Sequence, residues 1–147
     1  MTSASDVASV RREAVMRLPA DPSALNATIR ARTRLTLLGW CGNQVSAVNV
    51  LYVLVRNALR HGVVPGDPDH AKRGITVRLR VTETHLLHID VTDPTPEFPG
   101  FDRAVAGEYG RGLWGAKRLG AVVTWSRDPE HGGKTVRATM RPGPVDM

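Results

Sequence analysis

Three glycines at positions 110, 112 and 115 match the spacing G-x-G-x-x-G that is associated with dinucleotide binding. In that fold the motif follows a strand directly and opens the helix of a parallel βαβ unit. Asp128, about 20 residues further on, is in the place of the acidic residue that binds the ribose. However, the proline-rich stretch 93–110 before the glycines shows no strand pattern. We therefore interpret the glycines as a tight turn before a closely packed helix.

A second phosphate-binding pattern, Gly133-Lys134-Thr135, resembles the end of a P-loop. A P-loop needs a glycine five residues before Gly133, and this chain has Asp128 there. A P-loop also opens a helix, whereas the residues after Lys134 alternate as a strand does. Both differences exclude a P-loop.

A third interpretation joins four segments in chain order. Asn57 lies in "LVRNALRHG", Asp93 in "IDVTDPTPEFP", the glycine pair in "GRGL" and Thr135 in "GGKTV". Together these segments resemble the N box, the first and second glycine boxes and the terminal threonine of the histidine-kinase-like ATPase superfamily. The resemblance covers 13–140, and it is strongest to small bacterial ATP-binding proteins of the anti-sigma-factor serine kinase type, which share the "LPAD" opening.

The resemblance implies a role for each of these side chains in binding ATP and Mg²⁺. The amide oxygen of Asn57 suits Mg²⁺ that bridges phosphates, although an ordinary asparagine on a helix surface is the competing interpretation. The Asp93 carboxylate would accept a hydrogen bond from the adenine amino group, whereas guanine would present a carbonyl there. Asp-Pro is also a common start of a turn, so Asp93 is alternatively a turn residue.

The phosphates would lie at the second glycine box. Gly110 and Gly112 allow backbone N–H groups to approach phosphate oxygens, and a following helix N-terminus favours an anion. Thr135 would bond near the adenine, or is simply an edge-strand threonine. The remaining expected nucleotide-binding residues are Arg60, His61 and Arg111.

The chain departs from the superfamily at two places. Catalytic members have a glutamate general base four residues before the N-box asparagine, and this chain has Val53 there. Because four residues make about one helical turn, position 53 shares a face with Asn57, so the base is missing where it would act. In the first glycine box, Thr95 and Glu97 replace glycines, and we expect their side chains to crowd the ligand.

The first elements of the chain are expected to be a strand and a helix. The segment 12–21 is typical of a strand that ends at Pro19. Asp21 or Ser23 can cap a helix over 24–39.

A second helix, 44–61, is expected to carry Asn57 after a cap at Asn43. Its core face is predicted from apolar residues with 3,4 spacing at positions 45, 48, 52, 55 and 59. The segment 63–74 is expected to be a loop.

Alternation with a period of two then predicts an antiparallel hairpin with one buried face. The expected elements from there on are strands over 75–82 and 87–92, an aperiodic loop over 93–110 that is a candidate lid, a helix over 112–119, and strands over 121–126 and 134–140. This order predicts a two-layer α/β sandwich, with a mixed, mostly antiparallel sheet and helices on one face. We expect a flexible segment 1–12, an ATP-binding domain 13–140 and a tail 141–147.

The composition supports one globular domain: 147 residues, of which 41% are hydrophobic and 23% charged. No apolar run approaches the roughly 20 residues of a membrane span, and the N-terminus lacks a secretory pattern. With a single cysteine, Cys41, no internal disulfide can form, so a cytoplasmic protein is expected. Cys41 is expected to be a small buried residue.

The formal charge of +6 comes from scattered cations. Nucleic-acid binders usually show a basic stripe or stacking aromatics, and aromatic residues are only 5% here, so neither nucleic acid nor membrane is an expected partner.

Taken with the resemblance, these features predict an ATP-binding regulatory protein that binds a sigma factor or an antagonist domain, with catalysis weakened or lost at Val53. The resemblance also suggests a homodimer. Two alternatives stay open. One is an active serine/threonine kinase that phosphorylates the antagonist, and the other is a nucleotide-free scaffold that binds only protein.

Overall fold

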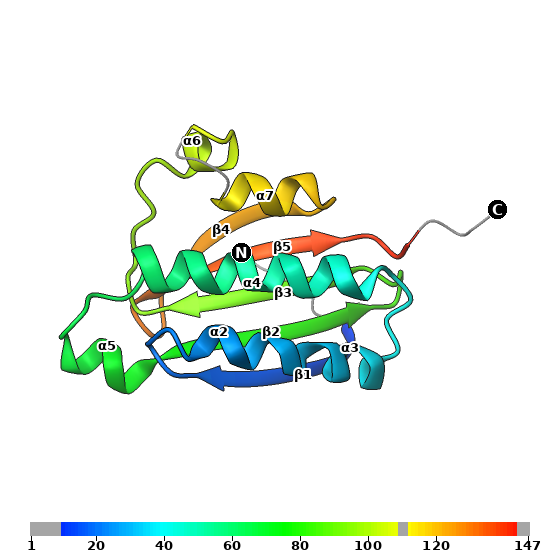
Figure 1. The fold of residues 1–147 in the computed structure, drawn as a ribbon, viewed down its shortest axis with the longest axis horizontal. Coiled ribbons are helices and arrows are strands. Elements are labelled where there is room, and N and C mark those ends of the chain that lie inside the picture. The colour runs from blue at the N-terminus through cyan, green and yellow to red at the C-terminus, as the bar shows by residue number, and fades with distance from the viewer. Residues whose placement is uncertain (1–9, 109–111, 144–147) are drawn as a thin grey trace.

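The computed structural model describes residues 10–108 and 112–143. It is a two-layer α/β sandwich in which the helices lie over one face of a five-stranded sheet with the order β1-β2-β3-β5-β4 (Figure 1). The strands are β1 (Val10–Leu18), β2 (Ile75–Thr82), β3 (Leu87–Asp93), β4 (Val122–Asp128) and β5 (Gly133–Met140). The helices are α2 (Ala24–Ala27), the 3₁₀ helix η1 (Thr28–Arg30), α3 (Ala31–Leu38), α4 (Gln44–His61), α5 (Pro68–Arg73), α6 (Phe101–Val105) and α7 (Gly112–Arg118). The predicted two-layer fold is confirmed.

Each of the four strand pairings is antiparallel, where a mixed, mostly antiparallel sheet was expected. The helical segment between β1 and β2 explains why these two strands are antiparallel rather than parallel. It runs out along α2 and α3 and back along α4, so the chain re-enters the sheet at the end where it left (Figure 1). β1 also begins at Val10, inside the segment 1–12 that was expected to be flexible.

The helix α4 has the predicted bounds, and the Asn43 side chain caps it by accepting a hydrogen bond of 3.0 Å from the Ser46 N–H. The predicted core face is right at Val55, which is buried, and in part at Val48 and Leu59, which are half-buried and pack against the core. It is wrong at Val45 and Tyr52, which are 55% and 41% exposed. The buried residues of α4 are Ala47, Val50, Leu51, Leu54, Val55 and Ala58. The predicted pattern left out Val50, Leu51 and Leu54 as well as the two alanines, and all of these belong to the buried face of the helix.

The predicted helix over 24–39 is divided in the structure. A 3₁₀ turn starts at Thr28, whose hydroxyl donates a hydrogen bond of 2.7 Å to the Leu25 carbonyl. Of the two candidate caps, Ser23 makes no side-chain cap. The Asp21 carboxylate instead accepts a hydrogen bond of 2.8 Å from the Ser23 N–H, so it organises the turn before the helix.

Two short helices lie in segments that were expected to be loops. α5 begins after Asp67, whose side chain accepts hydrogen bonds from the N–H groups of Asp69 and His70. α6 lies within 93–110. At six and five residues, both are too short for a periodic apolar pattern to predict. Cys41 is exposed, against the expectation that it would be buried.

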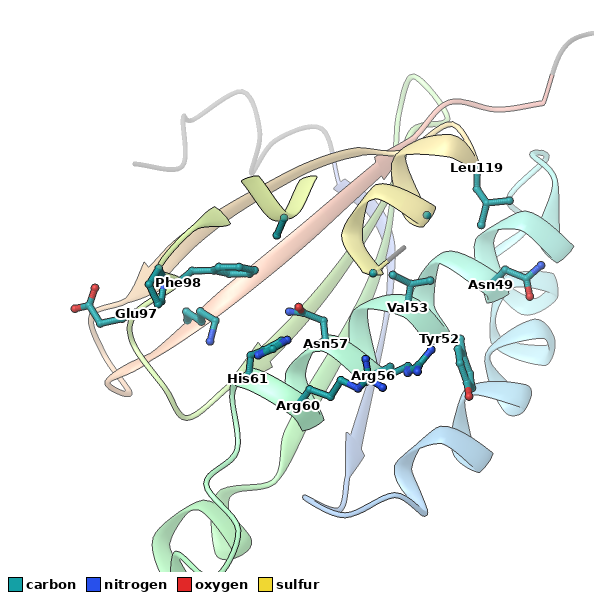
Figure 2. Close-up of a pocket in the computed structure, with 15 residues that line it drawn as sticks. Asn49, Tyr52, Val53, Arg56, Asn57, Arg60, His61, Glu97, Phe98 and Leu119 are labelled. Carbon is teal, nitrogen blue, oxygen red and sulfur yellow. The ribbon is translucent and has the colours of Figure 1, made fainter. Parts of the chain in front are cut away.

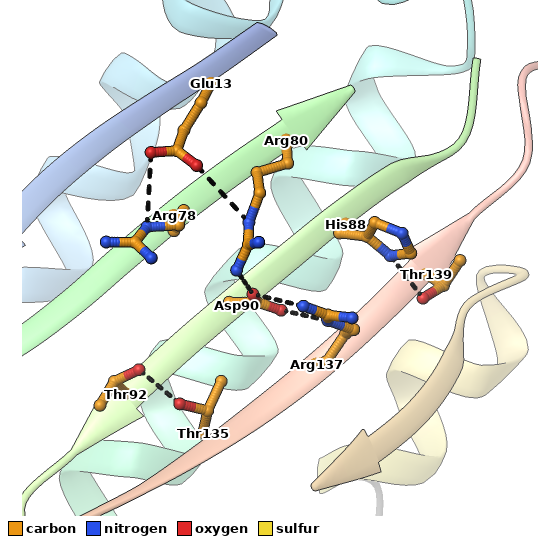
Figure 3. Close-up of polar contacts among 9 residues, drawn as sticks. All are labelled: Glu13, Arg78, Arg80, His88, Asp90, Thr92, Thr135, Arg137 and Thr139. Atoms are coloured by element: carbon orange, nitrogen blue, oxygen red, sulfur yellow. Dashed lines mark hydrogen bonds and ion pairs between the residues drawn. The ribbon is translucent and has the colours of Figure 1, made fainter. Parts of the chain in front are cut away.

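The face of the sheet away from the helices is polar. The Asp90 carboxylate, 4% exposed, lies between Arg80 at 2.8 Å and Arg137 at 2.7 Å (Figure 3). Glu13 pairs with Arg78 and Arg80 beside them. The apolar core therefore lies between the other face and the helices. None of the helices in the described ranges is long and apolar enough to cross a membrane.

Candidate functional site

A cavity of about 850 Å³ lies between α4, the segment 97–99 and the helices α6 and α7 (Figure 2). Its volume is within the range of small-molecule and cofactor sites. The lining residues are Asn49, Tyr52, Val53, Arg56, Asn57, Arg60, His61, Glu97, Phe98, Pro99, Ala104, Gly112, Gly115, Leu119 and Lys134. Of the sequence-predicted nucleotide residues, the cavity brings together Asn57, Arg60, His61 and Gly112.

One side of α4 forms a wall of this cavity. Asn49, Val53 and Asn57 follow one another at intervals of four residues, and all three line the cavity. A helix places such residues one turn apart on one face. The structure therefore places Val53 beside Asn57 within the cavity, where the resemblance would put a glutamate. Valine offers no atom that could accept a proton.

The Asn57 side chain has an unsatisfied donor. Its amide nitrogen is buried and has no hydrogen-bond partner. Buried polar atoms of this kind are uncommon in folded proteins, because each one loses its bonds to water without replacement. A ligand that carries acceptor atoms would satisfy it.

Basic side chains surround the same part of the cavity. Arg56, Arg60 and His61 come from the last turns of α4 (Figure 2). Among the described residues, Glu97 is the one carboxylate that lines the cavity, and it is neutralised by Arg127, whose Nη2 lies 2.6 Å from Oε1. The uncompensated charge of the lining is positive, so the cavity favours an anion such as a phosphate group.

The Asp93 side chain is not exposed to this cavity. Its carboxylate, 2% exposed, is paired with Lys134, which is 1% exposed and lines the cavity. The Lys134 Nζ lies 3.1 Å from Oδ1 and 3.1 Å from Oδ2, and its hydrogen bond goes to Oδ1. Burial raises the pKa of Asp93, and the nearby Lys134 ammonium offsets only part of that effect. The role of Asp93 in binding adenine remains a prediction, and the lysine competes with it.

Two glycines press against Asp93 from other sides. A Cβ at Gly62 would lie 2.1 Å from its Oδ2, and a Cβ at Gly133 would lie 2.0 Å from its backbone carbonyl oxygen. Any larger residue at these positions would collide with Asp93. The close fit fixes the aspartate in place between the end of α4 and the start of β5.

Thr135 lies on the opposite face of the sheet. β3 and β5 pair in a register that sets Asp93 opposite Lys134 and Thr92 opposite Thr135. Successive strand residues point to opposite faces, so Lys134 faces the helices and Thr135 faces away. The Thr135 hydroxyl is 2.7 Å from that of Thr92 (Figure 3). The structure therefore does not bring Thr135 to the cavity.

Of the second glycine box, Gly110 and Arg111 lie outside the described residues. Gly112 begins α7 and lines the cavity, with open space where a side chain would be.

Thr95 and Glu97, whose side chains were expected to crowd the ligand, make hydrogen bonds with other parts of the protein. The Thr95 hydroxyl donates a hydrogen bond of 2.8 Å to the Gly62 carbonyl, and its N–H donates one of 2.9 Å to Asp93. These bonds tie the segment to the end of α4. Glu97 lines the cavity but points away from α4 (Figure 2), and it accepts a hydrogen bond of 2.7 Å from Arg127.

Lys134 and Phe98 line the cavity but were not predicted as site residues from the sequence. Phe98 packs against Phe101 and Trp125, with ring centroids 5.0 and 5.9 Å away, and the Lys134 ammonium lies 5.5 Å from its ring centroid. A signal for Lys134 was present: it alternates with Val136 and Ala138, which marks an inward-facing lysine on a strand.

The lining residues fit the phosphate end of a Mg-nucleotide better than its adenine end. Within the described ranges, no three His, Cys, Asp or Glu side chains form a metal-binding group. Mg²⁺ would therefore arrive with phosphates and take the Asn57 amide oxygen as its protein ligand. The unsatisfied amide and the cations fit phosphates, but the paired Asp93 does not fit as an open acceptor for adenine.

No protein-family model matches the chain, and no curated protein sequence matches it. Among solved structures, the chain is similar to the crystal structure of the RsbU and RsbW domains of Rv1364c from Mycobacterium tuberculosis, with a TM-score of 0.58 and 21% identity. The match covers 93% of this chain and 35% of that one, so the chain spans about a third of the length of that protein. The chain therefore shares the fold of the matched part of that protein. This agrees with the fold that the resemblance to histidine-kinase-like ATPases implied.

Proposed function

We propose that the cavity binds Mg-ATP and that the chain acts as a regulatory protein by binding a protein partner. The observation that carries the proposal is the unsatisfied buried amide of Asn57 in a cavity whose lining is basic. Anions bind where donors and cations converge, and a triphosphate supplies both the charge and the acceptors. Arg60, His61 and Gly112 would contact the phosphates, together with Gly110 and Arg111 of the same glycine box.

The nucleotide would be held rather than turned over. Phosphoryl transfer needs a group that accepts the proton of the attacking hydroxyl or water, and such a base contributes roughly 10²–10⁴-fold. Val53 occupies the position beside Asn57 where that base would act. This supports a binding protein over an active serine/threonine kinase.

The partner would be a sigma factor or its antagonist, as the resemblance implies, with a homodimer as the acting form. Exposed apolar side chains on α3 and α4 support a protein contact: Leu37 is 73% exposed and Tyr52 is 41% exposed. A nucleotide-free scaffold is the second candidate, and the Lys134–Asp93 pair favours it because the pair closes the expected adenine site.

Calorimetric titration with Mg-ATP tests the proposal. We expect weak binding by the wild type and a loss of affinity of about tenfold or more in Asn57→Ala, because a ligand to Mg²⁺ is removed. Asn26→Ala, at an exposed position on α2, is the matched control and should bind as the wild type does. Equal binding by Asn57→Ala would contradict the assignment of the site, and no binding by the wild type would favour the scaffold.

A further inference from the structure

We propose that the open face of the sheet, the one away from the helices, carries a second binding site, for a phosphate monoester with a polyhydroxylated body such as a sugar phosphate. The site is a groove of about 570 Å³ across the strands. This volume lies within the range of small-molecule sites. The inference goes beyond the proposed function, because the groove shares no lining residue with the nucleotide cavity.

A row of polar side chains forms the floor of the groove. The strand registers set Arg17, Thr76, Thr92, Thr135 and Ser126 opposite one another across all five strands, and all of them line the groove. Residues directly opposite one another in paired strands share one face of the sheet. The hydroxyls of Thr92 and Thr135 share one hydrogen bond of 2.7 Å (Figure 3), so one of the two keeps a free donor. Within the described ranges, the hydroxyls of Thr76 and Ser126 have no hydrogen-bond partner, so the floor can bond the oxygens of a ligand.

Cations gather at the end of this row that lies on β1 and β2. Arg17 is directly opposite Thr76, Arg78 lies two residues further along β2 on the same face, and Lys72 lines the groove from α5. Arg17 and Lys72 are exposed, and neither has an ion pair within the described ranges. Arg78 is 44% exposed, and its ion pair with Glu13 is long, at 3.7 Å. This corner therefore has positive charge and donors that the protein itself leaves unused, and these are the groups that bind a phosphate.

The opposite end of the groove, at the turn between β4 and β5, has the other charge. Glu130 is exposed there, and its carboxylate has no partner in the described part of the chain. Asp128 is 3.0 Å from His131. Carboxylates accept hydrogen bonds from hydroxyl groups, and they repel a second phosphate. The groove therefore suits a ligand with one anionic end and hydroxyl groups over the rest of its length.

The same features argue against two other occupants of a basic face. Among the described residues that line the groove, none is Phe, Tyr or Trp, so a nucleic-acid base would have no ring on which to stack. A nucleic-acid strand would also bring further phosphates to the acidic end. A second copy of the chain would set the same cations against one another.

Amide NMR titrations of the full chain at constant ionic strength test the site, with glucose 6-phosphate, glucose and inorganic phosphate as the probes. We expect glucose 6-phosphate to shift the signals of 16–18, 74–78 and 134–136 and to bind about tenfold more tightly than inorganic phosphate, because only the ester also reaches the hydroxyl row. Glucose alone should cause no shifts. Equal affinities for the ester and for inorganic phosphate, or shifts confined to other parts of the chain, would overturn the inference.

Two variants remove the unpaired cations one at a time. Arg17→Gln and Lys72→Gln keep a polar side chain at an exposed position, and each should weaken the binding of glucose 6-phosphate about fivefold or more. Arg32→Gln, at an exposed position on α3, is the matched control: it removes the same charge elsewhere and should bind as the wild type does. Unchanged affinity in both groove variants would overturn the inference.

The inference and the proposed function can fail separately. Asn57→Ala should bind glucose 6-phosphate as the wild type does, because Asn57 lines the other cavity. Weaker binding in Asn57→Ala would place the ester in the nucleotide cavity and overturn the inference. If Mg-ATP binds and glucose 6-phosphate does not, the nucleotide site stands and this inference fails. If glucose 6-phosphate binds and Mg-ATP does not, the inference stands and the proposed function fails.

Discussion

Val53 and Asn57 share one face of α4 in the cavity, one turn apart. In the proposed site Asn57 would be the Mg²⁺ ligand, and Val53 beside it cannot act as a base. Two other carboxylates, Glu97 and Glu108, lie in the segment 93–110 and are the alternative candidates for a base. Both are engaged with arginines, Glu97 with Arg127 at 2.6 Å and Glu108 with Arg103 at 3.5 Å.

We predict that the wild type releases phosphate from ATP at a rate near background. Val53→Glu should raise that rate, because it places a carboxylate one turn from Asn57, and half-burial leaves the side chain open to the cavity. Asn49→Glu is the matched control: it adds a carboxylate to the same wall at two turns from Asn57 and should not raise the rate. Robust wild-type turnover that survives both Glu97→Gln and Glu108→Gln would contradict the loss of the base at Val53.

At the scale of elements, the segment 94–108 divides into two parts with different attachments. Thr95 is bonded to Gly62 and Asp93, and Phe98 packs on Trp125, so the first part is anchored to α4 and β4. α6 joins the same aromatic cluster through its first residue, Phe101, whose ring centroid lies 5.0 Å from that of Phe98 and 6.4 Å from that of Trp125, and its helix contacts are mainly with α7. A closing motion over the ligand is therefore expected beyond Phe101, in 102–108.

Hydrogen exchange with and without saturating Mg-ATP measures this division. Amides over 102–108 should exchange more slowly with the nucleotide bound, while those over 94–98 should change little because they are already anchored. The hairpin of β2 and β3 is the internal reference and should not change. Unchanged exchange throughout 94–108 at saturation would count against a lid.

Elements with strong local patterns could be predicted from the sequence most accurately. α4 and the hairpin of β2 and β3 have long periodic patterns and clear caps or turns, and their bounds agree with the structure. The common face of Val53 and Asn57 also followed from helix geometry alone. Short helices such as α5 offered no such pattern.

The part of the site that could not be predicted depends on pairing between strands that are far apart in the sequence. The pairing of β3 with β5 sets Asp93 opposite Lys134, and this register joins residues that are 41 positions apart. Without the strand order, Asp93 appeared as a free acceptor and Thr135 as its neighbour. The pairing instead gives Asp93 a buried lysine and sends Thr135 to the other face.

For the whole molecule, the two faces of the sheet differ in character. The helical face carries the cavity, and the open face carries a network of arginines and carboxylates around Asp90 (Figure 3). The candidate ligand site and the polar face therefore lie on opposite sides of β3 and β5.

We propose that the helical side of the molecule holds a nucleotide without cleaving it. Equilibrium dialysis of the wild type against Mg-ATP labelled on the γ-phosphate, followed by separation of the bound label, tests both parts in one measurement. We predict that label accumulates with the protein as intact ATP, with no more free phosphate than in a protein-free cell. No accumulation of label with the protein, or label recovered mainly as free phosphate, would contradict this account.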